Sequence, residues 1–173
     1  MQQDPHHNYA FIDAQNLYLN VKTLGWKVDY IKFRRYLKEK YRIERAYMFM
    51  GFLPGNQDLY NFLQTTGFIL VFKPTIPNQD GDVKGNCDAE LVLQVMIDFL
   101  KYEKALLVTG DGDFYCLVKY LQTKGKLLRV LDPSPQSCSS LLTKIARNDI
   151  TFVSDLKHKV AYIRKEPHAD ETA

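Results

Sequence analysis

Two short apolar runs, far apart in the chain, are each followed closely by an aspartate. Residues 9–12 precede Asp13, and residues 105–108 are followed by Thr109, Gly110 and Asp111. Short apolar runs that alternate with helical patterns predict a parallel sheet that is buried on both faces. In such sheets, ligands bind beyond the carboxyl ends of the strands, at the point where the strand order reverses. The two aspartates therefore predict a shared acidic site, suited to a cation, at that edge of the sheet.

The rest of the chain continues the alternation of strands and helices. Strands are expected at residues 9–13, 43–52, 68–72, 104–109 and 126–131, with a short edge strand at 150–153. Helices are expected at residues 29–41, 56–66, 87–102, 114–124 and 137–146. The nearly all-apolar helix at 87–102 should be buried, because helices that are apolar all round usually are. The pattern predicts one three-layer α/β/α sandwich around a central, mainly parallel sheet of about five strands.

The two ends of the chain and one internal segment differ in composition from the rest. Residues 1–8 are polar and are expected to be flexible, and the charged residues 157–173 are expected to form a disordered tail. The folded domain is then expected to span residues 9–156. Residues 73–86 contain two prolines and two glycines, which predicts an exposed loop.

Composition narrows the class of protein. A chain of 173 residues that is 46% hydrophobic suits one domain with a sizeable core and is not a disordered chain. The net charge of +3 is too small for a polycation, although a local basic rim could still bind nucleic acid. The three cysteines are far apart, which argues against a disulfide framework and a zinc knuckle and fits a reducing compartment. Because residues 1–8 do not resemble a signal peptide and the apolar stretch at 91–100 is too short to span a bilayer, we expect a cytoplasmic protein without a membrane partner.

A third carboxylate, Asp88, lies in the first turn of the expected 87–102 helix. Its spacing from Val92 and Val95 places it on a face shared with core residues, at the end where the helix dipole favours an anion. Two carboxylates ~4 Å apart repel by roughly 4 kcal/mol at an effective dielectric constant near 20. A cluster of three would therefore raise its own pKa values or hold a divalent cation. An all-oxygen site suits Mg²⁺ or Mn²⁺ rather than zinc.

Each of these residues also has a purely structural interpretation. Asp88 could be an ordinary helix N-terminal carboxylate, and Asp13 a turn residue. Asp113 could cap the helix that follows it. Asn16 could supply a neutral amide oxygen to the site or orient a carboxylate, or it could cap the next segment. It is the convergence of several elements on one end of the sheet that favours the cation site.

Other motifs are incomplete. Residues 80–91 begin like a calcium loop, but Lys84 and Leu91 replace the ligands expected at the fifth and twelfth positions. Neither a P-loop nor a Gly-x-Gly-x-x-Gly sequence is present. The four histidines lie in the two end regions, so a Ser-His-Asp arrangement lacks a base.

Three sequence blocks resemble the signature blocks of NYN domains in order and spacing. They are Phe11-Ile12-Asp13-x-x-Asn16-Leu17, Lys84-Gly85-x-x-Asp88 and Thr109-Gly110-Asp111-Gly112-Asp113-Phe114. The resemblance covers roughly residues 9–156. NYN domains belong to the PIN-like superfamily, which has a central parallel sheet flanked by helices and includes metal-dependent ribonucleases.

The resemblance implies roles for individual residues. The metal-binding set would be Asp13, Asp88, Asp111 and Asp113, with Asn16 as the asparagine of the site. Lys84 matches the lysine that precedes the acidic helix and could meet a phosphate. In many relatives the last helix ends in a further aspartate, whereas this chain has Ala146-Arg147-Asn148 there, and Asp149 is out of register.

Three functions are compatible with these features. The leading hypothesis is a Mg²⁺- or Mn²⁺-dependent endoribonuclease that hydrolyses RNA at Asp13, Asp88 and Asp111. The alternative is a non-catalytic module that binds RNA or a protein and retains a metal site. A metal-dependent phosphatase for small molecules is disfavoured, because Asp13 is followed by Ala14 and Gln15 rather than by an Asp-x-Asp sequence.

Contacts with single-stranded or structured RNA would come from basic and aromatic side chains near the mouth of the site. The candidates are Lys22, Lys27, Lys84 and Arg147 for phosphates, and Tyr18 or Trp26 for base stacking. A homodimer is also compatible with the sequence.

Overall fold

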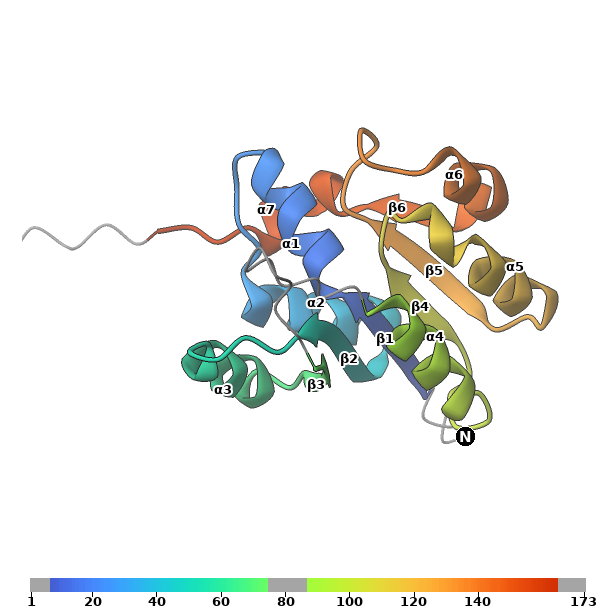
Figure 1. Cartoon of the computed structure of the whole chain (residues 1–173). Coiled ribbons are helices and arrows are strands. Elements are labelled where there is room, and N and C mark those ends of the chain that lie inside the picture. The colour runs from blue at the N-terminus through green and yellow to red at the C-terminus, as the bar shows by residue number, and fades with distance from the viewer. Residues whose placement is uncertain (1–6, 75–86, 165–173) are drawn as a thin grey trace, which may run out of the picture.

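The computed structural model describes residues 7–74 and 87–164, which form a single sheet covered by helices on both faces (Figure 1). Six strands of the described chain pair in parallel in the order β3-β2-β1-β4-β5-β6. They are β1 (Asn8–Asp13), β2 (Ile43–Gly51), β3 (Ile69–Lys73), β4 (Ala105–Val108), β5 (Leu127–Asp132) and β6 (Ile150–Phe152). The predicted three-layer α/β/α sandwich is confirmed. The sheet has six strands in the described residues and not about five as expected, because the short segment at residues 150–152 pairs with β5 as a sixth strand.

The helices divide between the two faces of the sheet. One face is covered by α1 (Ala14–Thr23), α2 (Tyr30–Tyr41), α3 (Gln57–Thr65) and α7 (Lys157–Val160). The other is covered by α4 (Asp88–Ile97), α5 (Tyr115–Thr123) and α6 (Ser140–Ala146). Among the described residues, three 3₁₀ turns connect elements: η1 (Gly112–Phe114), η2 (Arg147–Asp149) and η3 (Val153–Leu156).

Strand β1 shows how the sequence builds both cores at once. Tyr9 and Phe11 point into the core beneath α4 and α5, whereas Ala10 and Ile12 point into the core beneath α1 and α2. All four are buried because successive side chains of a strand face opposite sides, and both sides of this sheet are covered. Residues 9–12 are apolar because both of their sides are covered, and Asp13 is the last residue of the strand.

The strand order reverses between β1 and β4. The chain runs outward from β1 through β2 to β3, and then crosses to the other side of β1 to form β4. The carboxyl ends of β1 and β4 therefore flank the crevice where ligands bind in sheets of this kind. Asp13 is the last residue of β1 and Asp111 follows β4, so the aspartates lie where the sequence predicted.

Helix α4 differs from its expected form. The sequence predicted a buried helix at 87–102, but α4 ends at Ile97 and buries only one stripe, which includes Leu91 and Val95. Leu100, in the turn that follows, is 92% exposed. The prediction of burial is wrong because α4 covers the sheet with one side, and within the described residues no element packs against its other side.

The end of the domain lies beyond the expected boundary at residue 156. Lys157–Val160 form α7, in which Val160 is fully buried, and Val28 pairs with Ala161 in an antiparallel bridge. The Val160 side chain and hydrogen bonds from the Asp29 N–H to the Val160 carbonyl and from Lys32 Nζ to the Ala161 carbonyl anchor this basic segment against α2. In the described part of the chain, none of the helices has the length and apolar character needed to span a bilayer.

Candidate metal centre

Asp13 ends β1 and begins α1. Its Oδ1 accepts a hydrogen bond from the backbone N–H of Asn16 at 3.0 Å, so it is the N-cap of α1. Burial raises the pKa of Asp13 to about 6, although the Asn16 hydrogen bond opposes this, and the nearby charges of Asp88 and Asp111 raise it further. A carboxylate in this setting is destabilised by its surroundings and gains from a cation beside it.

Asn16 connects the two turns that carry the aspartates. Its Oδ1 accepts a hydrogen bond from the backbone N–H of Gly110 at 2.9 Å, across 94 residues of sequence. Its own backbone N–H holds Asp13. The amide oxygen thus bonds to a backbone N–H and not to a carboxylate, so Asn16 holds together the turns that precede Asp111 and follow Asp13.

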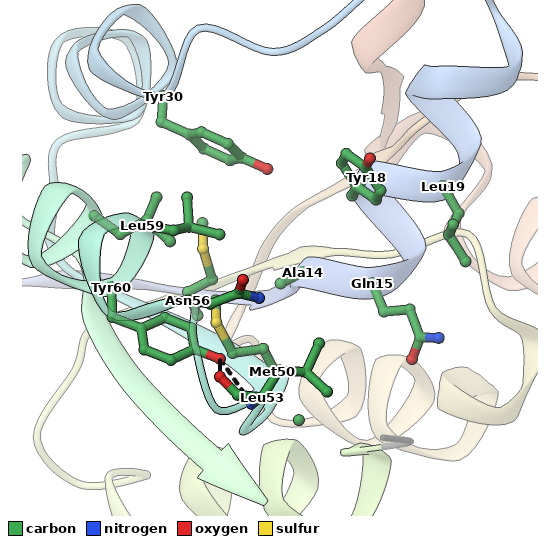
Figure 2. A pocket seen from close by; sticks show the side chains of 13 residues that line it. Ala14, Gln15, Tyr18, Leu19, Tyr30, Met50, Leu53, Asn56, Leu59 and Tyr60 are labelled. Carbon is green, nitrogen blue, oxygen red and sulfur yellow. Dashed lines mark hydrogen bonds between the residues drawn. The ribbon is translucent and has the colours of Figure 1, made fainter. Parts of the chain in front are cut away.

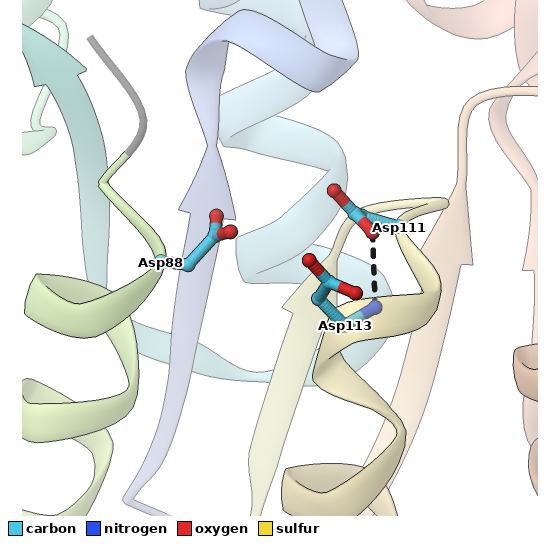
Figure 3. A group of neighbouring side chains, drawn as sticks. All are labelled: Asp88, Asp111 and Asp113. Atoms are coloured by element: carbon cyan, nitrogen blue, oxygen red, sulfur yellow. Dashed lines mark hydrogen bonds between the residues drawn. The ribbon is translucent and has the colours of Figure 1, made fainter.

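Asp88, Asp111 and Asp113 form a compact acidic group at the starts of α4 and η1 (Figure 3). One carboxylate oxygen from each residue lies within 4.8 Å of the other two. Asp111 Oδ1 also accepts the backbone N–H of Asp113 at 2.9 Å, which fixes the geometry of the turn. Asp113 is exposed, whereas Asp88 and Asp111 are half-buried. Asp13 lies outside this group of three but interacts with Asp88 and Asp111 through its charge.

The arrangement fits a hard divalent cation. Oxygens on opposite sides of a Mg²⁺ ion are about 4 Å apart, because each Mg–O bond is ~2.1 Å. The three carboxylate oxygens of the acidic group lie within 4.8 Å of one another, which is the same scale. All donors are oxygens, the set that Mg²⁺ and Mn²⁺ prefer.

A further buried aspartate, Asp132, was missed by the sequence analysis. It ends β5, is fully buried, and its Oδ1 accepts the backbone N–H of Ser134 at 3.0 Å. Burial raises its pKa, and a hydrogen bond from the Cys138 thiol partly opposes this. A Cβ on Gly110 would lie 2.8 Å from Asp132 Oδ2, so only glycine fits there. The signal was present in the sequence, because Asp132 also terminates an apolar strand.

The residues predicted to contact phosphates do not lie directly beside the aspartates. Lys22 is in the last turn of α1, roughly 13 Å along the helix from Asp13, with its Nζ 5.6 Å from the centre of the Tyr18 ring. Lys84 lies outside the described residues. Arg147 follows the C-terminus of α6, whose N-terminus adjoins Gly112.

The expectation that Arg147 lies near the mouth of the site is not supported. The reason is that α6 runs antiparallel to the strands, so its last residues lie toward the opposite edge of the sheet. A nearer cation that the sequence analysis missed is Lys73, at the end of β3, which pairs with Glu90 of α4 at 3.7 Å.

Comparison with known proteins agrees with this architecture. The chain is 25% identical to the low amplitude and bright protein LabA of Synechococcus elongatus, over 90% of this chain and 86% of LabA. A crystal structure of a Vibrio parahaemolyticus protein of unknown function superimposes with a TM-score of 0.75, covering 94% of this chain and all of that one at 24% identity, which shows a shared fold. The model of the NYN domain matches residues 9–152, which include all four aspartates of the acidic site. The chain therefore belongs to the NYN domain family.

Proposed function

We propose that this protein is a divalent-metal-dependent ribonuclease that hydrolyses phosphodiester bonds in RNA. The observation that carries the proposal is the acidic group of Asp88, Asp111 and Asp113, with Asp13 beside it, at the strand-order reversal. Membership of the NYN family supports a nuclease fold. Acidic groups are common on protein surfaces, but this one lies where sheets of this kind bind ligands.

The residues of the site divide into ligands and positioning groups. Asp13, Asp88 and Asp111 would hold Mg²⁺ or Mn²⁺, which when bound would supply an activated water and charge stabilisation on the phosphate. Asp113 is the exposed member and is suited to orient the attacking water or accept its proton. Asn16 keeps the two turns in register through Gly110.

Substrate guidance is also part of the proposal. Lys22 and Lys84 would contact phosphates along the strand, and Lys73 is a third basic group on the α4 side. We also propose the cytoplasmic location expected from the sequence, which suits three cysteines that, all within the described residues, form no disulfide. The homodimer stays a prediction.

The proposal is tested by cleavage of end-labelled, partly structured RNA with Mn²⁺, with Mg²⁺ and with EDTA. Asp111→Asn should lower the rate at least a thousandfold, about 4 kcal/mol of transition-state stabilisation. Asp155→Asn, an exposed carboxylate in η3, is the matched control and should cut at the wild-type rate. Equal, metal-independent cutting by wild type and Asp111→Asn would contradict the proposal.

A second candidate is an RNA-binding module that retains the metal without turnover. One observation favours it. The match to LabA spans most of both chains, and the name of LabA describes amplitude and brightness and not a reaction. In that case the protein would shift the mobility of RNA and leave it intact with Mn²⁺, and Asp111→Asn would still bind.

A further inference from the structure

A pocket of about 490 Å³ lies beside the acidic site and is not used by it (Figure 2). It is enclosed by α1, by the carboxyl end of β2, by α3 and by Tyr30 at the start of α2. Its volume falls within the range of about 300–1,000 Å³ found for pockets that hold small organic groups. The pocket therefore has the size of a ligand site.

The lining of the pocket is apolar with a few neutral polar groups. Tyr18, Tyr30 and Tyr60 contribute rings, and Gln15 and Asn56 contribute primary amides. Within residues 7–74 and 87–164, no charged side chain lines it. An occupant with a phosphate or another charge would lose its hydration without gaining a partner, so the pocket suits a neutral and largely flat group.

Two features show that the polar groups are available to a ligand. Asn56 is the N-cap residue of α3, yet its side chain makes no capping hydrogen bond and its amide points toward the pocket (Figure 2). In the described part of the chain, the Gln15 and Asn56 amides have no hydrogen-bond partner. By contrast, the Tyr60 hydroxyl bonds to the backbone N–H and C=O of Leu53 at 2.8 and 3.3 Å, which fixes its ring as a wall.

The pocket and the acidic site share one edge of the sheet. Asp13 pairs in register with Phe49 on β2, and Met50, the next residue, lines the pocket. Neighbouring strands are roughly 4.8 Å apart, so the backbone at the pocket lies about one strand spacing from Asp13. Ala14 and Gln15, which directly follow Asp13, form part of the wall. Adjacent nucleotides of one strand could therefore reach both places.

We propose that this pocket receives one unstacked base of the RNA strand whose backbone lies at the acidic site, and this inference rests on the function proposed above. Aromatic rings and primary amides are the groups with which proteins hold an extruded base, by stacking and by hydrogen bonds to its edge. The base stacks against the tyrosine rings, and Gln15 and Asn56 read its edge. Tyr18, which the sequence analysis named for stacking, is 49% exposed and forms one wall of the entrance.

The experiment measures binding without cutting. Labelled single-stranded RNA ten nucleotides long is titrated with protein in EDTA, and each position is made abasic in turn. The fluorescence anisotropy should show a loss of affinity of about tenfold for one position and little change for the others. Equal affinity for all abasic strands would overturn the inference.

Pocket variants link that position to the pocket. Leu59→Trp, on α3, fills the space, and should abolish the dependence on the abasic position, whereas Leu100→Trp, at a 92% exposed site, should preserve it. Asn56→Ala should weaken binding about fivefold without a loss of thermal stability, because no cap bond is removed. Asn61→Ala, on the same helix, is its control. Unchanged position dependence in Leu59→Trp would contradict the inference.

Further arms separate the alternatives. Calorimetry with the four free nucleosides tests whether the pocket binds a free nucleoside instead of a base within an RNA strand. Nucleoside binding that is lost in Leu59→Trp, together with equal affinity for all abasic RNAs, would overturn the inference. Position-dependent binding by a protein that does not cut RNA would contradict the nuclease proposal alone. Cutting without position dependence would contradict the pocket inference alone.

Discussion

Strands β4 and β5 pair side by side, and an aspartate lies at the end of β5 and another just beyond the end of β4, in different environments. Asp111, after β4, is half-buried and belongs to the acidic group, with its Oδ1 holding only the turn that carries Asp113. Asp132, at the end of β5, is fully buried against Gly110 and bonded to the Ser134 backbone. The same local pattern thus yields one carboxylate open to a ligand and one that shapes the turn beside it. The segment that follows each strand determines whether its aspartate is open to a ligand or buried.

The largest difference should appear in catalysis. Asp88→Asn should reduce RNA cleavage at least a thousandfold, because it removes an anionic ligand from the group within 4.8 Å. Asp132→Asn should reduce it no more than about tenfold, because asparagine still accepts the Ser134 N–H and the residue lies outside the acidic group. Single-turnover rates with Mn²⁺ measure both. Similar losses in the two variants would place Asp132 among the ligands and remove the distinction.

The next effect concerns the pH dependence of stability without metal. Because the pKa of Asp13 is raised from 3.8 to about 6, the folded state holds more protons than the unfolded state between those values. The free energy of unfolding should therefore fall as pH rises from about 4 through 6, by about 3 kcal/mol from this group. Asp13→Asn keeps the helix cap and should flatten the curve.

Urea denaturation in EDTA across this pH range tests the prediction. Asp13→Asn should be more stable than wild type at pH 7, and Mn²⁺ should stabilise wild type more at pH 7 than at pH 5. A variant that is less stable than wild type at pH 7 would show that the Asp13 carboxylate is favoured by its surroundings.

A smaller effect concerns the contact between the two turns. Gly110→Ala should destabilise the fold by about 2 kcal/mol, because the added Cβ would lie 2.8 Å from Asp132 Oδ2. The double variant with Asp132→Ala should recover part of that loss, since the space is then free. Chemical denaturation of the four proteins of this cycle measures the coupling. If the losses of stability in the two single variants add up in the double variant, the added Cβ and the Asp132 side chain do not clash.

The smallest effect concerns Asn16. Asn16→Ala removes the acceptor of the Gly110 N–H and should cost about 1 kcal/mol of stability. It should also weaken Mn²⁺ binding, because the turn before Asp111 loses its brace. Asn20→Ala, which removes a bond to the Asn16 carbonyl on the same helix, is the control and should leave Mn²⁺ affinity unchanged. Calorimetric Mn²⁺ titration that shows equal affinity for wild type and Asn16→Ala would contradict the positioning role.

The sequence predicted the features that depend on short segments of the chain, namely the strands and the positions of their ends. The strands end where apolar residues end, and parallel pairing then brings Asp13 and Asp111 to one edge regardless of the details between them. The exposure of Leu100 could not be predicted, because the apolar composition of a helix does not determine how many of its sides other elements cover. The distance of Arg147 from the site depends on the direction of α6. The pocket around Asn56 depends on how α1, β2 and α3 meet, which no single segment specifies.

The most direct test of the central claim is anomalous diffraction from crystals grown with Mn²⁺. The proposed metal site predicts an anomalous peak bonded to oxygens of Asp88 and Asp111, with Asp13 or Asp113 completing the protein ligands, and no such peak in Asp111→Asn crystals. A peak elsewhere on the protein, or a site without metal at saturating Mn²⁺, would contradict it.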